Sequence, residues 1–82
     1  METYIYRVAL TATYSDAEFR TANFELDIPS ECPFTPREVF TQAHGITSCY
    51  TSSAINDGKI AMRLNTIFSG EITFNIKIIL IK

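Results

Sequence analysis

Tryptophan is absent from this 82-residue sequence, and histidine occurs once, cysteine twice and glycine three times. A structural zinc site takes about four ligands with short paired spacings, which so few histidines and cysteines do not supply. Each glycine falls where a cap or a turn is expected, so no glycine-rich loop is available to bind phosphate groups. We therefore expect no metal, no cofactor and no small-molecule substrate.

Neither a long apolar run nor an excess of one charge is present. No segment approaches the ~20 apolar residues of a membrane-spanning helix, and the net charge of −2 gives little long-range attraction for nucleic acid. Residues Met1 to Thr3 lack the basic and apolar regions of a signal peptide, which predicts a cytoplasmic protein with reduced cysteines. Apolar residues make up 46% of the chain, enough for the core of a single domain spanning residues 1–82.

The clearest pattern is strict alternation at the end of the chain, from Glu71 to Lys82. Side chains on a strand point alternately to opposite faces, so apolar side chains at every second position predict a strand with one wholly apolar face. Those side chains are Ile72, Phe74, Ile76, Ile78 and Leu80. Alternation also predicts earlier strands at Tyr4–Thr13, Phe19–Ile28 and Lys59–Phe68, and the segment Thr47–Ile55, rich in serine and threonine, is interpreted as a fourth.

A short helix is predicted in the middle of the chain, after a proline-rich break. Thr35 is a good N-cap, Pro36 suits the first helical position, and Glu38 completes a capping box. Gly45 is typical of a C-cap, which gives a helix from Pro36 to His44. Because so short a helix is not stable alone in water, it is expected to pack its apolar side chains onto the sheet. These are Val39, Phe40 and Ala43.

The predicted order is therefore β-β-α-β-β-β, an α+β fold with a five-stranded mixed or antiparallel sheet and one short helix packed on one face. The first two strands are expected to form a hairpin, and Asn56-Asp57-Gly58 signals a tight turn between the next two. The order resembles the β-grasp group in outline, which implies parallel first and last strands at the centre of the sheet. The alternative is an antiparallel sheet whose last three strands form a meander. The predicted core contains Tyr6, Val8, Leu10, Phe24, Leu26, Ile28, Val39, Phe40, Ile60, Met62, Leu64, Phe74, Ile76 and Ile78.

A few side chains have the chemistry of an active site, and each has a simpler structural explanation. Cys32 and Cys49 are typical of small buried thiols, and His44 would interact favourably with the dipole at the end of the predicted helix. Glu25 and Asp27 share a strand face about 7 Å apart, a spacing that suits an acid–base pair but is also ordinary on the solvated side of a sheet. We therefore predict that the chain is not an enzyme and has no catalytic residues.

Single-stranded nucleic-acid binding is the alternative function. Four basic residues fall on the polar faces of the first, fourth and fifth predicted strands, and they form a basic band if that face of the sheet is open. These residues are Arg7, Lys59, Arg63 and Lys77. The aromatic side chains of the strands lie on the opposite face, while Glu25 and Asp27 share the basic face and weaken its field. Nucleic acid is therefore the less favoured partner.

An apolar cluster on an otherwise polar face is the strongest functional signal. Ile5, Ile79 and Ile81 occupy positions on that face, and a cluster of exposed isoleucines needs an explanation that a single one does not. If the first and last strands run antiparallel, Ile5 lies near Ile79 and Ile81, whereas in parallel strands the patch dissolves. The competing explanation is that the loop from Pro29 to Phe34 covers these side chains.

We therefore predict a small non-enzymatic protein-binding module that acts by occupying a partner surface. The partner would be another protein or a second copy in a dimer. The predicted partner-binding residues are Ile5, Arg7, Lys77, Ile79 and Ile81. Short chains with no catalytic set are common among phage and mobile-element proteins that inhibit host enzymes, so an inhibitor or accessory protein of that kind is the expected context.

Overall fold

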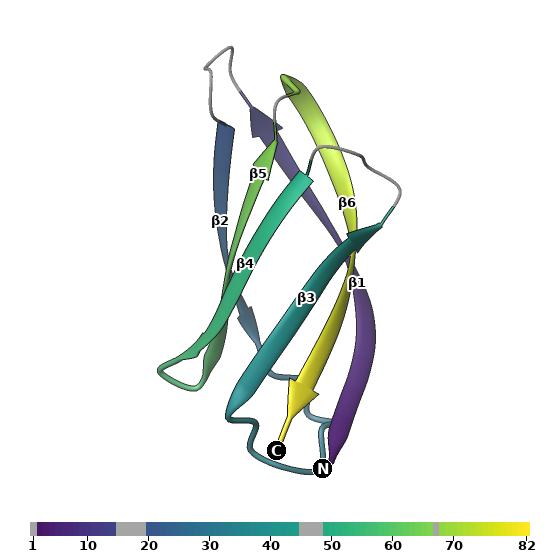
Figure 1. The fold of residues 1–82 in the computed structure, drawn as a ribbon, viewed down its shortest axis with the longest axis vertical. Coiled ribbons are helices and arrows are strands. Elements are labelled where there is room, and N and C mark those ends of the chain that lie inside the picture. Colours follow the sequence, from purple (N-terminus) through teal and green to yellow (C-terminus); the bar gives the residue numbers. More distant parts are fainter. Residues whose placement is uncertain (1, 15–19, 45–48, 67) are drawn as a thin grey trace.

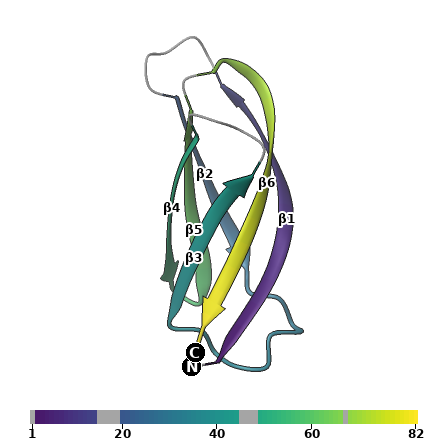
Figure 2. The same ribbon diagram turned by 45° about the vertical axis from the view of Figure 1, so that its right-hand side comes forward.

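Two antiparallel sheets of three strands each pack face to face around one core (Figure 1). The computed structural model describes residues 2–14, 20–44, 49–66 and 68–82, and within these ranges every regular element is a strand. The strands are β1 (Thr3–Tyr14), β2 (Arg20–Asp27), β3 (Glu38–His44), β4 (Cys49–Asn56), β5 (Lys59–Thr66) and β6 (Gly70–Ile81). One sheet has the order β1-β6-β3 and the other β2-β5-β4, and Figure 2 shows them as two layers.

The predicted α+β fold is wrong, because the segment expected to be a helix is strand β3. This strand pairs antiparallel with β6 along its whole length, and the pairing is preceded by a bond from the Arg37 N–H to the Ile81 carbonyl at 2.9 Å. So short a helix has little stability of its own, whereas pairing with β6 gives the backbone hydrogen-bond partners and buries Val39. The capping-box residues Thr35 and Glu38 therefore lead into a strand. The expected C-cap, Gly45, lies outside the described residues.

Neither predicted arrangement of a five-stranded sheet is present. β1 pairs antiparallel with β6, and β2 pairs antiparallel with β5, so the predicted hairpin of the first two strands and the final meander are both wrong. The strands β1 and β6 have the same length of 12 residues and match end to end. The predicted turn at Asn56-Asp57-Gly58 is confirmed, since it joins β4 to β5 and holds Asp57 and Gly58 at φ of 54° and 74°.

The core lies between the sheets and is built from the inward positions of the alternating strands. Predicted core residues that are buried are Val39, Ile60, Met62, Leu64, Phe74, Ile76 and Ile78. Predicted core residues that are half-buried against them are Tyr6, Val8, Leu10, Phe24, Leu26 and Ile28. Phe40 was wrongly assigned to the core, because β3 directs it outward, while Tyr14 and Leu80 are buried core residues that were not predicted.

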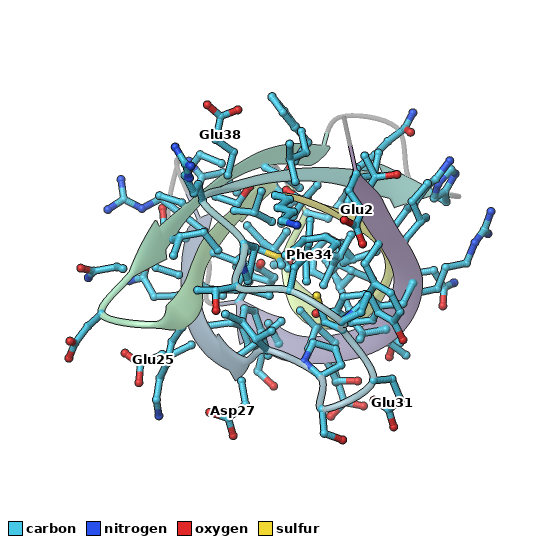
Figure 3. The ribbon with its side chains drawn as sticks, turned by 90° about the horizontal axis from the view of Figure 1, so that it is seen from below. Glu2, Glu25, Asp27, Glu31, Phe34 and Glu38 are labelled. Atoms are coloured by element: carbon cyan, nitrogen blue, oxygen red, sulfur yellow. The ribbon has the colours of Figure 1, made fainter. Side chains whose placement is uncertain are left out.

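Polar contacts and one loop close the space between the sheets. The Tyr14 hydroxyl of β1 donates to the Leu64 carbonyl of β5 at 3.0 Å. At the neighbouring edges of β3 and β4, the Thr41 hydroxyl donates to the Ser53 hydroxyl at 3.1 Å. The segment 28–37 crosses one end of the molecule, where Phe34 lies over the opening between the strands (Figure 3). These hydrogen bonds and the segment 28–37 therefore lie at the edges and at one end of the two sheets. They leave the outer faces of both sheets uncovered.

Candidate functional site

The outer face of the β1-β6-β3 sheet carries a row of apolar side chains that spans all three strands. Ile79 of the central strand lies opposite Ile5 in one ladder and opposite Phe40 in the other. Ile5 is 54% exposed and Phe40 is 56% exposed, while Ile79 is half-buried. We call these three residues the apolar row.

The antiparallel alternative for the first and last strands is the one that the structure has. Ile81 lies on the same outer face as the apolar row, two residues farther along β6, and is half-buried. The competing explanation was that the loop from Pro29 to Phe34 covers these side chains, but Cys32 and Phe34 of this loop pack against the core. The exposure of Ile5 and Phe40 shows that the apolar row is not covered.

Two cations lie directly opposite each other beside the apolar row. Arg7 pairs with Lys77 in the β1–β6 ladder, two residues along from Ile5 and Ile79, and Gln42 of β3 completes that level of the sheet. Like charges directly opposite each other on antiparallel strands destabilise a sheet. We call Arg7 and Lys77 the basic pair.

No carboxylate of the described residues forms an ion pair with the basic pair. In those parts of the chain the ion pairs join Lys59 to Glu25 and Asp27, and Lys82 to Glu2. The carboxylates in outward positions of the β1-β6-β3 sheet are Glu38 and Glu71. By the strand register they lie about 14 Å and about 20 Å along the sheet from the level of Lys77, at ~3.4 Å per residue. Both separations, measured along the backbone, exceed the distance of ~8 Å over which salt screens exposed charges, so neither carboxylate of this described face compensates the basic pair.

The outer face of the β2-β5-β4 sheet has the opposite character. Lys59 Nζ lies 3.5 Å from a Glu25 oxygen and 3.4 Å from an Asp27 oxygen, and Arg63 Nε donates to the Asn23 side-chain oxygen at 3.3 Å. The Asp27 charge and its hydrogen bond, followed by those of Glu25, raise the pKa of Lys59 above its ordinary value. This face also holds an open hollow of about 550 Å³. Small side chains line part of it: Ser52, Ala54 and Ala61.

The predicted basic band is therefore divided between the two sheets. Arg7 and Lys77 lie on one outer face, whereas Lys59 and Arg63 lie on the other and are bound to side chains of their own sheet. A protein that binds single-stranded nucleic acid needs a continuous groove of positive charge along the strand it holds. The division removes the band on which the nucleic-acid alternative depended.

The other residues considered for chemistry are accounted for by local structure. Among the residues that the structure describes, no group of three or more metal-ligating side chains is present. Cys32 is a free thiol that donates to the Phe34 carbonyl at 3.3 Å, and the side chain of Cys49 lies outside the described residues. His44 ends a strand and not a helix, so its predicted interaction with a helix dipole is wrong.

The inner face of β1 carries the other clear pKa shift. Burial raises the pKa of Tyr6, and the neighbouring Tyr4 and Cys32 raise it further. The rings of Tyr4 and Tyr6 lie 5.8 Å apart between centroids. These side chains face the core and not the basic pair, so the shift reflects packing.

Sequence reasoning missed Phe40 because the capping pattern before it favoured a helix. The strand alternation that could have found it is present but weak, with Val39, Thr41 and Ala43 at inward positions. The outward positions are Phe40, Gln42 and His44, of which two are polar. Only the pairing of β3 with β6 brings Phe40 beside Ile79.

A scan against protein-family models finds no family that matches the chain, and searches of curated proteins and of solved structures find no similar protein. The described residues contain no helix, and hence none that could span a bilayer. Function is therefore inferred from the two outer sheet faces.

Proposed function

We propose that the chain is a non-enzymatic module that binds another protein through the outer face of the β1-β6-β3 sheet. The observation that carries this proposal is the exposed apolar row of Ile5, Ile79 and Phe40, with Ile81 beside it. Single exposed apolar residues are ordinary on a protein surface, whereas a contiguous group of them is characteristic of an interaction site.

The size of this group suits the centre of a protein interface. The apolar row occupies one outward level of three strands ~4.8 Å apart, with levels ~6.8 Å apart, so together with Ile81 it covers on the order of 100 Å². A standard interface buries about 800 Å² on each partner, and its most important residues concentrate near the centre. The apolar row would form that centre, and the polar remainder of the same face would form the rim.

A hollow beside the apolar row offers a place for an anchoring side chain. It lies between β3 and β4 and has a volume of about 300 Å³. Its lining combines the apolar Val39, Phe40 and Ile55 with the charged Arg37 and Glu38 and the small Ser53 and Ala54. β3 and β4 belong to different sheets, so their facing edges are not joined by a backbone ladder. A buried side chain in such a hollow is a common source of binding energy at the centre of an interface.

Within this proposal, the specific role is that of an inhibitor or accessory protein that acts by covering part of its partner. An origin in a phage or mobile element and a cytoplasmic location stay predictions from the sequence alone.

The proposal is tested by site-specific photo-crosslinking in the cells from which the sequence comes. A photo-reactive amino acid replaces Ile5 or Phe40, and in control proteins it replaces Thr21 or Ser52 on the other sheet. We expect one adduct of the same mass from the first two positions and not from the controls. Identical adducts from both faces, or none from Ile5 and Phe40, would contradict the proposal.

A further inference from the structure

The basic pair has an unfavourable arrangement that nothing in the described residues relieves. Arg7 and Lys77 face each other across the β1–β6 ladder, and neither forms an ion pair with a described carboxylate. On the other sheet, by contrast, Lys59 lies against two carboxylates. Since a directly opposed pair of like charges costs stability, an anion bound between the two cations would relieve that cost.

The position of the basic pair connects it to the apolar row. On β1 and on β6, each cation is two residues from an isoleucine of the row and points to the same side of the sheet. Outward side chains two residues apart are separated by ~6.8 Å. An extended segment of a partner has the same spacing between its residues i and i+2. A partner strand with an apolar residue and a carboxylate two positions apart can therefore place the apolar residue against the apolar row and the carboxylate between the two cations of the basic pair.

A second copy of the chain supplies this carboxylate only in an oblique orientation. If two faces pack about a two-fold axis through Ile79 along the strands, Lys77 meets Lys77 of the other copy. If the axis runs across the strands, Lys77 meets Ile81 of the other copy, and Arg7 meets Thr3. Neither of these arrangements places a carboxylate against a cation.

A two-fold axis oblique to the strands would bring Glu38 of one copy to Arg7 of the other, but it would place Lys77 over Phe40 of the apolar row. We therefore favour a different protein as the source of the carboxylate.

Nucleic acid also fits the face poorly. Beyond the basic pair, the next outward level consists of Ala9, Asn75 and His44, with no lysine or arginine to continue a track of positive charge. Phe40 is the one aromatic side chain on the apolar row, whereas single-strand binders stack successive bases on several.

We infer that the outer face of the β1-β6-β3 sheet recognises an acidic, apolar segment of a partner protein, with a carboxylate between Arg7 and Lys77 and an apolar side chain against the apolar row. This inference rests on the proposed function and specifies the chemistry of the partner. Lys77 and Arg7 supply the charge, and Ile5, Ile79 and Phe40 supply the apolar contact.

The test uses two synthetic peptides that differ in one group. The first is acetyl-Thr-Phe-Thr-Glu-Thr-amide, and the second has glutamine in place of glutamate. Each is titrated into the ¹⁵N-labelled protein at low salt, and binding is followed by amide shifts. We expect the glutamate peptide to bind roughly two- to five-fold more tightly, the range expected of one exposed charge pair, with shifts centred on β1 and β6.

Two double variants locate the effect. In the variant with Arg7→Gln and Lys77→Gln, the difference between the two peptides should disappear. In the matched variant with Lys59→Gln and Arg63→Gln, which removes two cations from the other sheet, the difference should persist. Equal binding of both peptides to the unmodified protein, or no shifts on β1 and β6, would overturn the inference.

The competing sources of an anion are also measured. Inorganic phosphate and an oligothymidylate are titrated under the same conditions. If either displaces the glutamate peptide and itself binds β1 and β6 more tightly, the face recognises phosphate groups and the inference is overturned.

The inference and the proposed function fail in different ways. If the crosslink from Phe40 forms and its yield is unchanged in the variant with Arg7→Gln and Lys77→Gln, the docking face stands and the acidic partner is wrong. If no crosslink forms from Ile5 or Phe40 in the unmodified background, the docking face itself is wrong.

Discussion

Both outer sheet faces are built from three strands, but they differ in whether their basic side chains have polar partners on the same face. On the β2-β5-β4 face, Lys59 and Arg63 are bound by neighbouring acidic or amide side chains. On the β1-β6-β3 face, Arg7 and Lys77 oppose each other beside three apolar side chains. The first face shows how this chain builds a surface whose charges are satisfied internally.

This comparison shows that the unfavourable surface features of the protein lie on the β1-β6-β3 face. Solubility would favour polar residues in place of Ile5 and Phe40, and folding would favour opposite charges in place of the basic pair. Features that break such local rules without an internal compensation tend to lie at functional sites. The β1-β6-β3 face collects several of them in adjacent levels, which is why it is the proposed docking surface.

The largest effect separates the core from the apolar row. Phe74 is fully buried, so Phe74→Ala should lower the free energy of unfolding by about 3–5 kcal/mol. Phe40→Ala should change it by less than about 1 kcal/mol, because most of that ring already contacts water. Urea denaturation of both variants measures the difference. Similar losses would show that Phe40 belongs to the core and that the two faces do not differ as described.

The next effect concerns binding. Phe40→Lys should weaken the interaction with the crosslinked partner by at least about 30-fold, since it places a charge at the centre of the interface. Thr21→Lys, which adds the same charge to an edge strand of the other sheet, should have little effect. Titration calorimetry with the purified partner measures both. Equal losses from the two variants would remove the distinction between the faces.

A smaller effect tests the cost of the basic pair. Lys77→Glu turns a like-charged pair into an opposite-charged one and should raise the stability by about 0.2–1 kcal/mol at low salt. Added salt should reduce this gain, because it screens both pairs. Arg63→Glu should instead destabilise the protein, since it loses the bond to Asn23 on a face whose charges are already matched. Thermal unfolding of both variants at two salt concentrations measures these changes. If Lys77→Glu lowers the stability, the basic pair is not unfavourable and this prediction is wrong.

The smallest effect is a pH dependence on the other face. The pKa of Lys59 is raised above its ordinary value of 10.5, so its ion pairs add stability below that pH and lose it as the pH rises through the folded-state pKa. The stability difference between the unmodified protein and Lys59→Gln should therefore be small at pH 8 and narrow further above pH 10.5. Denaturation curves of the two proteins at each pH measure this stability difference. A difference that widens as the pH rises would contradict a raised pKa of Lys59.

Much of the local structure followed from alternation in the sequence. The pattern of Phe74, Ile76 and Ile78 predicted a strand with a buried face, and these side chains are fully buried. The turn at Asn56-Asp57-Gly58 was predicted because it needs residues that tolerate positive φ, and Asp57 and Gly58 adopt it. Both predictions depend on a few neighbouring residues, and this is why they succeeded.

The failures came where distant segments compete. The signals at Thr35, Pro36 and Glu38 favoured a helix, but β3 pairs with β6 along its whole length and buries Val39. The candidate site was predicted in part, since Ile5 and Ile79 depended on an antiparallel pairing that the sequence left open. Phe40 was not predicted, because its place on the surface follows from its strand neighbour and not from its own segment.

The sequence by itself determined which side chains share a face of each strand, because alternation is a property of consecutive residues. Only the tertiary structure decided which strands are neighbours, because pairing depends on how well distant apolar faces bury one another. Ile5, Phe40 and Ile79 come from three separate parts of the chain. They form one row only because β6 lies between β1 and β3.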